Sequence, residues 1–142
     1  MNRNNGVLED VRVNIKIKLA FLWTAVMFCY IYGDYFELYV PSKMAGFISG
    51  ETMLNSPLKL FSASVLLAIP AIMIFLSVTL KPTINKILNI IFGVFFTLIM
   101  LLIAVTSLSP WYTFYVFLAI VESVITSMIV WHATKWPRAN VD

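Results

Sequence analysis

Residues 84–107 read INKILNIIFGVFFTLIMLLIAVTS, and the only charged residue in this stretch is Lys86, close to its start. A helix needs about 20 consecutive, mostly apolar residues to cross the hydrocarbon core of a bilayer. The stretch therefore predicts one membrane-spanning helix. Three further stretches are long and apolar enough for the same prediction, at about 18–39, 58–80 and 111–135.

The composition of the whole chain agrees with this reading. Of the 142 residues, 61% are hydrophobic and 12% are charged, whereas a soluble domain is typically about 25% charged. Short links at 81–83 and 107–110 place successive helices side by side and antiparallel. We expect an all-α, polytopic membrane protein: a single membrane domain over residues 1–142, folded as an antiparallel four-transmembrane-helix bundle whose longest loop is 41–57.

The distribution of basic residues predicts the orientation. Only Lys43 and Lys59 fall on the side of the 41–57 loop. The N-terminus, the 81–86 turn and the C-terminus together carry Arg3, Arg12, Lys16, Lys18, Lys81, Lys86, Lys135 and Arg138. Because cytoplasmic segments are enriched in Lys and Arg, both termini are expected in the cytoplasm and the 41–57 loop outside.

Small and weakly polar residues indicate where the helices meet. Lipid tails are as apolar as leucine, so close approach and interhelical hydrogen bonds must hold such helices together. Asn85, Asn89, Gly93 and Thr97 follow one another at four-residue steps, which places them on one helix face. We expect this face to be a packing seam. Pro70, in the middle of 58–80, is expected to kink its helix.

Glu122 lies near the middle of 111–135, close to the expected bilayer midplane. A charge there costs about 2.5–3.5 kcal/mol on insertion scales, and no basic residue is expected at that depth. Either the carboxyl carries a proton at neutral pH, or a cavity supplies a cation, water or strong donors. A neutral carboxyl that hydrogen-bonds helices together is the alternative. The candidate donors to the Glu122 carboxyl are Asn85, Asn89, Thr97 and Thr126.

A second polar cluster occupies residues 30–39, YIYGDYFELY. Tyr30, Asp34 and Glu37 share a helix face at this spacing. They form either a mouth that attracts cations or a place where an aromatic ligand stacks. In the alternative, these acids are interfacial and pair with Lys43 or Lys59. If the first and fourth helices are neighbours, Asp34 and Glu122 line one cavity open to the outside.

The sequence therefore yields a hypothesis for a ligand-binding site and lacks the parts of a catalytic or metal site. The ligand-binding residues would be Asp34, Glu37, Glu122, Tyr30, Tyr115 and Asn89. Cys29 is the only cysteine and His132 the only histidine, which excludes a disulfide, a bis-histidine haem and a His-rich metal site within one chain. No catalytic residue, cofactor or nucleic-acid partner is expected, since no basic patch is interleaved with stacking aromatics.

The sequence also resembles a known group. Residues 30–41 (YIYGDYFELYVP) and 131–137 (WHATKWP), together with 67–82 and the rest of 109–137, resemble an uncharacterised family of small bacterial four-helix membrane proteins over nearly the whole chain. The resemblance implies the fold and a bacterial inner (plasma) membrane, and it implies no activity. More loosely, the layout is similar to DoxX-like proteins, some of which are linked to redox complexes.

Three functions are compatible with these features. The first is a non-enzymatic bundle that binds a small lipophilic or cationic ligand, or a partner protein, in the acidic and tyrosine-lined cavity. The second is a small proton-coupled exporter that uses Glu122. Small multidrug exporters also combine four short helices with one buried glutamate, although theirs lies in the first helix. The third is an accessory subunit of a membrane redox complex. The expected partners are the lipid bilayer and either a homo-oligomer or a larger membrane complex.

Overall fold

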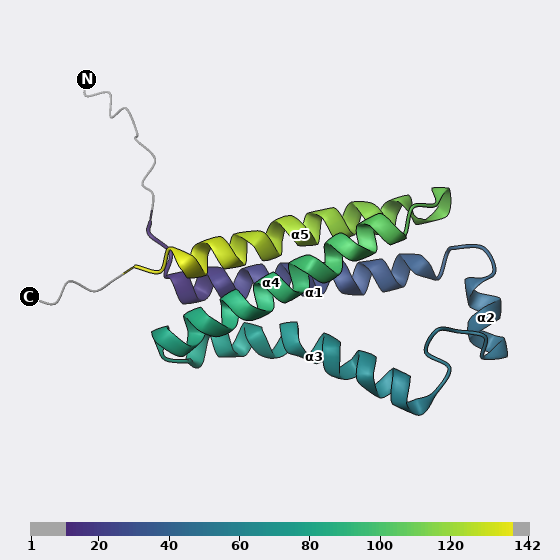
Figure 1. The fold of residues 1–142 in the computed structure, drawn as a ribbon, viewed down its shortest axis with the longest axis horizontal. Coiled ribbons are helices and arrows are strands. Elements are labelled where there is room, and N and C mark those ends of the chain that lie inside the picture. Colours follow the sequence, from purple (N-terminus) through teal and green to yellow (C-terminus); the bar gives the residue numbers. More distant parts are fainter. Residues whose placement is uncertain (1–10, 138–142) are drawn as a thin grey trace, which may run out of the picture.

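The computed structural model describes residues 11–137, which form α-helices joined by short turns and contain no β-strand (Figure 1). In chain order the elements are α1 (Ile15–Glu37), α2 (Lys43–Ser49), α3 (Pro57–Thr79), α4 (Pro82–Thr106), the 3-10 turn η1 (Pro110–Tyr112) and α5 (Thr113–Thr134). The spans Ile15–Glu37, Pro57–Thr79, Pro82–Thr106 and Pro110–Thr134 are long and apolar enough to cross a membrane. The predicted all-α fold with four such helices is confirmed.

The helix ends differ slightly from the expected ones, for local reasons. α1 begins at Ile15 rather than near residue 18, because the Asn14 side chain accepts a hydrogen bond from the backbone N–H of Lys16 at 2.9 Å. Ser56 caps α3 in the same way, and Pro57 follows it at the first helical position. The loop at 41–57 contains α2, a helix that the sequence analysis does not predict.

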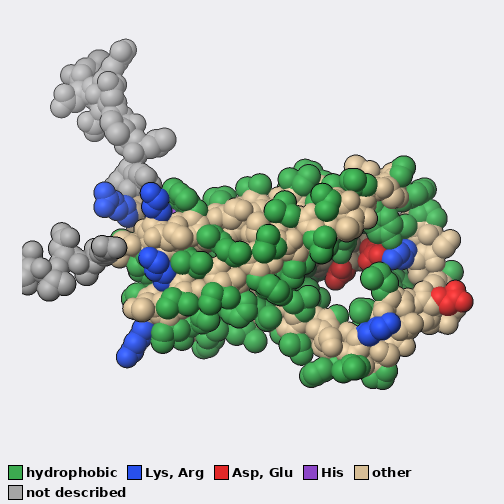
Figure 2. Space-filling view, in the orientation of Figure 1, with side chains coloured by type: hydrophobic (Ala, Val, Ile, Leu, Met, Phe, Trp, Pro, Cys, Tyr) green, Lys and Arg blue, Asp and Glu red, His purple; other side chains and the backbone are tan. Residues whose placement is uncertain are grey.

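The helices run back and forth between two ends of the bundle. α1 packs against α3 and α5, and α4 packs against α5. One end of the bundle, which we call the basic end, contains the start of α1, the end of α5 and the turn between α3 and α4 (Figure 1). The opposite end contains α2, and we call it the α2 end. Lys and Arg gather at the basic end (Figure 2). Among the described residues these are Arg12, Lys16, Lys18, Lys81, Lys86 and Lys135, against Lys43 and Lys59 at the α2 end.

The polarity of the bundle is the reverse of that of a water-soluble protein. Apolar side chains cover much of the visible surface (Figure 2), and Leu98, Phe21 and Phe75 are each more than 60% exposed. The buried positions, by contrast, include six polar residues: Ser77, Asn85, Asn89, Glu122, Ser123 and Thr126. An apolar exterior around a partly polar interior suits a protein surrounded by lipid.

One buried hydrogen-bond network ties three helices together towards the basic end. Asn89 Oδ1 on α4 accepts a hydrogen bond from Trp23 Nε1 on α1 at 2.8 Å. Its Nδ2 donates to Asn85 Oδ1 at 2.7 Å, and Asn85 Nδ2 donates to the Ser77 carbonyl on α3 at 2.6 Å. The predicted seam face of α4 is therefore buried, and part of it holds α1 and α3 rather than α5.

The α4–α5 seam depends on the absence of a side chain at Gly93. A methyl group added there would lie 2.7 Å from Val130 Cγ2 and 3.4 Å from the Thr126 carbonyl oxygen. One turn further along, the Thr97 hydroxyl donates a hydrogen bond to the Thr126 hydroxyl at 2.7 Å. Close backbone approach at a small residue, with an interhelical hydrogen bond beside it, is typical of helix contacts within membranes.

α3 packs closely only along its second half. Its buried residues are Pro70, Met73 and Ser77, and none of residues 57–69 is buried. α3 changes direction along its length and diverges from α1 towards the α2 end (Figure 1). Pro70 lies where close packing begins, and its missing N–H removes one backbone hydrogen bond from the helix. An opening remains beside the first half of α3, the half nearer the α2 end, and acidic side chains border this opening (Figure 2).

The seam can be tested with two glycine variants. Alanine in place of glycine gains about 1 kcal/mol of helix propensity at either position. At Gly33 the added methyl group would meet Tyr115 Cε2 at an ordinary 3.5 Å, so Gly33→Ala should preserve or raise stability. Gly93→Ala must displace Val130, and such overpacking typically costs about 1–3 kcal/mol. Thermal unfolding in detergent should show Gly93→Ala clearly below Gly33→Ala; equal midpoints would contradict the seam.

Candidate functional site

A small cavity lies between α1, α4 and α5, on the side of the bundle nearer the α2 end. Its volume is about 30 Å³. The cavity is lined by Cys29, Tyr30, Gly33 and Asp34 of α1, Met100 and Ile103 of α4, and Tyr115, Leu118, Ala119 and Glu122 of α5. A water molecule needs at least about 10–15 Å³ measured in this way, and drug-sized ligands occupy about 300–1,000 Å³. The cavity thus has room for one or two water-sized groups.

Glu122 forms the deepest polar part of this cavity. It is the central residue of the span Pro110–Thr134, and only 3% of it is exposed. Its Oε2 atom is buried and has no hydrogen-bond partner, and the ion pair found among the described residues joins two other side chains. A carboxyl at this depth therefore meets neither a basic side chain nor a hydrogen-bond donor from the described part of the protein.

The partners that we expected for Glu122 bind elsewhere, so that prediction is wrong. The Thr126 hydroxyl lies 2.8 Å from the backbone carbonyl of Glu122, where a helical threonine commonly donates, and does not contact the carboxyl. Thr97 bonds to Thr126. Asn85 and Asn89 belong to the Trp23 network. Each of these side chains therefore forms its hydrogen bonds with another group, either within one turn of its own helix or on a neighbouring helix. The Glu122 carboxyl is left without them and lines the cavity.

Tyr30 adds a second polar group without a partner. Its hydroxyl is buried and makes no hydrogen bond. Its ring lies 6.3 Å from the ring of Phe96, which in turn meets Trp23 edge-on at 6.0 Å. Trp23 and Phe96 are fully or almost fully buried and belong to the apolar core that fills the basic half of the bundle. This packed core closes the cavity on the side of the basic end.

Asp34 and Tyr115 complete the polar lining. Asp34 is exposed and lies one helical turn beyond Tyr30 on α1. Tyr115 lies on the facing helix, α5, with its ring close to Gly33. The structure therefore brings together four of the predicted site residues, namely Tyr30, Asp34, Tyr115 and Glu122. An exposed carboxyl at the edge and a buried one at the base make an acidic path from the surface to mid-bundle.

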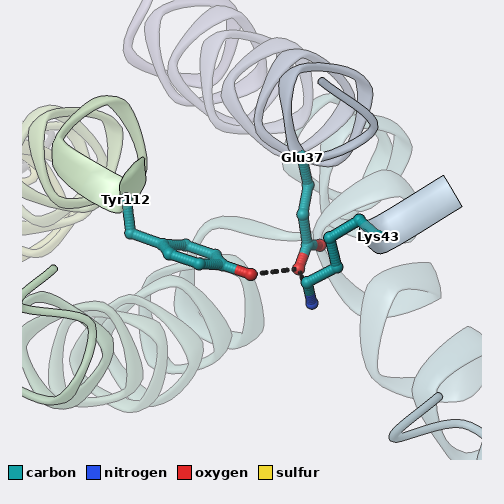
Figure 3. Close-up of polar contacts among 3 residues, drawn as sticks. All are labelled: Glu37, Lys43 and Tyr112. Carbon is teal, nitrogen blue, oxygen red and sulfur yellow. Dashed lines mark hydrogen bonds and ion pairs between the residues drawn. The ribbon is translucent and has the colours of Figure 1, made fainter. Parts of the chain in front are cut away.

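Glu37 lies outside the cavity and has a different role. Its Oε1 atom pairs with Lys43 Nζ of α2 and accepts a hydrogen bond from the Tyr112 hydroxyl at 3.4 Å (Figure 3). The Lys43 Nζ atom also lies 5.6 Å from the centroid of the Tyr112 ring. The hydrogen bond that Lys43 Nζ donates to Glu37 raises the pKa of Lys43 above its usual value. This cluster connects α1, α2 and η1 at the α2 end, whereas Lys59 binds Asn55.

Asn89 also lies away from the cavity. Both ends of its amide are engaged in the network with Trp23 and Asn85, which accounts for its burial without a ligand. Several cavity residues were not among those predicted from the sequence. Cys29 and Gly33 stand four residues apart and share a helix face, a signal that the sequence does contain. Met100 and Ile103 have no signal that distinguishes them from other aliphatic residues of α4.

The polar groups that line this cavity are mainly oxygen atoms, beside the thiol of Cys29. Two carboxyl groups and two phenol hydroxyls line it. No group of three or more His, Cys, Asp or Glu residues suited to a metal ion occurs within residues 11–137. Such a lining can hold a proton, or it can accept hydrogen bonds from a small cation of the ammonium type.

The fold and the cavity together define a class: small all-helical proteins with four membrane-length helices and an acidic pocket between three of them. Residues 8–142 match the family of unknown function DUF6326, and the chain belongs to this family. The expected membership of an uncharacterised family is confirmed. No curated protein and no solved structure matches the chain. The DoxX-like layout, the bacterial origin and the redox-complex role stay predictions.

The different surroundings of the three acids predict different reactivities. A water-soluble carbodiimide with an amine trap should modify exposed Asp34, and it should modify Glu122 slowly or not at all, because Glu122 is 3% exposed. Glu37 serves as an internal control, since its pairing with Lys43 should slow its reaction. Mass spectrometry of the digested, folded protein gives the three yields. An unreactive Asp34 beside a reactive Glu122 would contradict the described cavity.

Proposed function

We propose that this protein spans a bacterial inner membrane and binds a proton at the Glu122 carboxyl. In this proposal the bound proton is exchanged for a small cation. In this proposal the basic end faces the cytoplasm and the α2 end faces outwards. Six described Lys and Arg residues at the basic end, against two at the α2 end, support that orientation. The apolar exterior of the bundle supports insertion into lipid.

The observation that carries the proposal is the unpaired carboxyl of Glu122. An ionised carboxylate removed from water costs several kcal/mol unless hydrogen bonds or an opposite charge compensate it. None of the described side chains supplies either to Oε2. Two species can neutralise this group, namely a proton bound directly to the carboxyl or a cation held in the cavity. Ionisable groups within membrane spans mark proton and ion pathways for this reason.

The size of the cavity restricts the cation. At about 30 Å³ it accommodates a group of the size of water or ammonium, and a bulky lipophilic ligand does not fit. Ammonium-type cations donate hydrogen bonds in several directions, and Glu122, Asp34 and the Tyr115 hydroxyl supply oxygen acceptors. The negative charge of Asp34 at the exposed edge favours the arrival of cations over anions. We therefore favour a small cationic ligand over a lipophilic one.

Infrared spectroscopy can test proton binding directly. At neutral pH the wild-type protein should show the carbonyl stretch of a protonated carboxylic acid, and Glu122→Gln should remove this band. Glu51→Gln, at an exposed acid in the α2–α3 loop, serves as the matched control and should leave the band unchanged. A wild-type protein without such a band, or a band that persists in Glu122→Gln, would refute proton binding at this residue.

The same band tests the exchange for a cation. At constant ionic strength, ammonium should lower the protonated fraction of Glu122 at a given pH, because the bound cation favours the carboxylate. Tetramethylammonium carries the same charge and is too large for the cavity, so it should leave the band unchanged. Equal effects of both ions would indicate nonspecific screening, and the absence of any ammonium effect would leave a site for protons alone.

Proton-coupled transport is the second candidate function, and the closed floor of the cavity favours it. The cavity residues lie in the half of the bundle nearer the α2 end, whereas Trp23 and Phe96 seal the basic half. Access from one side only, with a binding group near the midplane, is the arrangement expected of one state of an alternating-access carrier. A carrier would open the Trp23–Phe96 contact in its other state.

Liposomes that contain a pH-sensitive dye can test transport. With an imposed pH gradient, and with ammonium present on the opposite side of the membrane as the exchanged cation, wild-type protein should dissipate the gradient faster than empty liposomes under the same conditions, and Glu122→Gln should abolish the difference. Glu51→Gln should match the wild type, and Asp34→Asn should reduce the rate without abolishing it, because Asp34 lies at the edge of the path. Wild-type rates equal to those of empty liposomes would exclude transport and leave the binding proposal unaffected.

A further inference from the structure

A second hollow lies at the basic end, far along the bundle from the acidic cavity. It is a groove of about 290 Å³ on the outside of the α1–α5 pair. Val13, Lys18, Phe21 and Leu22 line it from the α1 side, and His132 of α5 lines it from the other. The groove is therefore mostly apolar, with one lysine and one histidine at its border.

Lys18 lines the groove and has no polar partner among the described residues, as is also true of Lys81 and Lys135 outside the groove, whereas Lys16 and Lys86 do have partners. Lys16 Nζ donates to the carbonyls of Val78 and Leu80 at 3.2 and 2.6 Å, at the end of α3. Lys86 Nζ donates to the carbonyl of Thr134 at 3.4 Å, at the end of α5. Both lysines thus satisfy helix C-termini, where cations are stabilising. The charge of Lys18 faces the groove without such a role.

The groove presents polar and apolar side chains in the same order as the headgroup and acyl chains of a phospholipid. Lys18 lies close to the beginning of α1, whereas Phe21 lies three residues, about 4.5 Å, further along the helix. Phe21 is 70% exposed, so its ring is available for contact with apolar chains. Trp131 is 57% exposed beside His132, with ring centroids 4.8 Å apart. Exposed tryptophans of this kind settle at the membrane–water interface, which places Lys18 and His132 at headgroup level.

We propose that this groove binds an anionic phospholipid. The lipid phosphate would contact Lys18 and His132, and the first part of an acyl chain would lie along Phe21 and Leu22. Charge complementarity selects an anionic headgroup, and the apolar lining selects a lipid over a free anion. The inference rests on the proposed membrane insertion, but it is independent of the role of Glu122 and of which end faces the cytoplasm.

Native mass spectrometry of the full chain in detergent can test the site. The protein is titrated with phosphatidylglycerol or with phosphatidylcholine that has the same acyl chains. Phosphatidylglycerol should bind more tightly, and Lys18→Gln should weaken its binding about fivefold, the effect of one basic residue near an anionic lipid surface. Lys18→Arg should retain the binding. Lys81→Gln, at an exposed lysine of the same end outside the groove, serves as the matched control.

Several results would overturn the proposal. These are equal binding of the two lipids, an equal loss in Lys81→Gln and Lys18→Gln, and displacement of phosphatidylglycerol by an equal concentration of inorganic phosphate. Phe21→Ala should weaken the binding of both lipids, and unchanged binding would count against the acyl contact. Circular dichroism checks that each variant is folded. If Lys18→Gln does not fold, Lys18→Met, which keeps an uncharged side chain of similar length in the groove, takes its place, with the same expected loss of preference for phosphatidylglycerol. Loss of proton binding in Glu122→Gln with unchanged lipid binding separates the two proposals.

Discussion

Helices with apolar exteriors gain no free energy from packing their apolar faces together in lipid, because lipid tails cover those faces equally well. Specific polar contacts and close backbone approach must therefore hold this bundle. The hydrogen bond from Trp23 to Asn89 and the bonds of Asn85 join α1, α3 and α4. The close approach at Gly93 joins α4 to α5. Individual interhelical hydrogen bonds of this kind are worth about 0.6 kcal/mol on average, so the bundle depends on their sum.

These contacts are distributed unevenly between the two ends. The basic half contains the satisfied network around Asn89 and the packed core of Trp23, Met73, Phe96 and Ile129. The half nearer the α2 end contains a diverging α3 and two buried polar groups without partners. A buried polar group left unpaired costs about 1–3 kcal/mol. Such groups are rare in proteins and need an explanation of their own. Here both line the same cavity, and the proton or small cation that we propose to bind there would neutralise the Glu122 carboxyl.

The three acids of the spans show how depth and neighbours decide what a carboxyl does. Glu37 ends α1 and finds Lys43 and Tyr112, so its charge is used to fix α2 to the bundle. Asp34, one turn deeper, is exposed beside the cavity and keeps contact with the surroundings. Glu122 is almost fully buried and has no partner. Only the last arrangement supports the proposal that a proton or a small cation binds to the carboxyl.

The sequence by itself determined the four spans, because the length of an apolar stretch suffices to predict a membrane-length helix. It also determined the depth of Glu122 and the burial of Asn85, Asn89 and Gly93, since position along a helix and four-residue spacing are properties of one helix. It did not reveal α2, whose short segment KMAGFIS is joined to the rest of the bundle through Lys43, which pairs with Glu37 and lies over the ring of the distant Tyr112.

Only the tertiary structure decided which faces meet. It placed Asp34 and Glu122 in one cavity, directed Glu37 to Lys43, and assigned Asn89 to Trp23 instead of to a ligand. Periodicity defines a face within a single helix and contains no information about the neighbour across from it. Which two faces pack together depends on the fit between the two helices. Lipid solvates every apolar face equally well, so it does not favour one pairing over another.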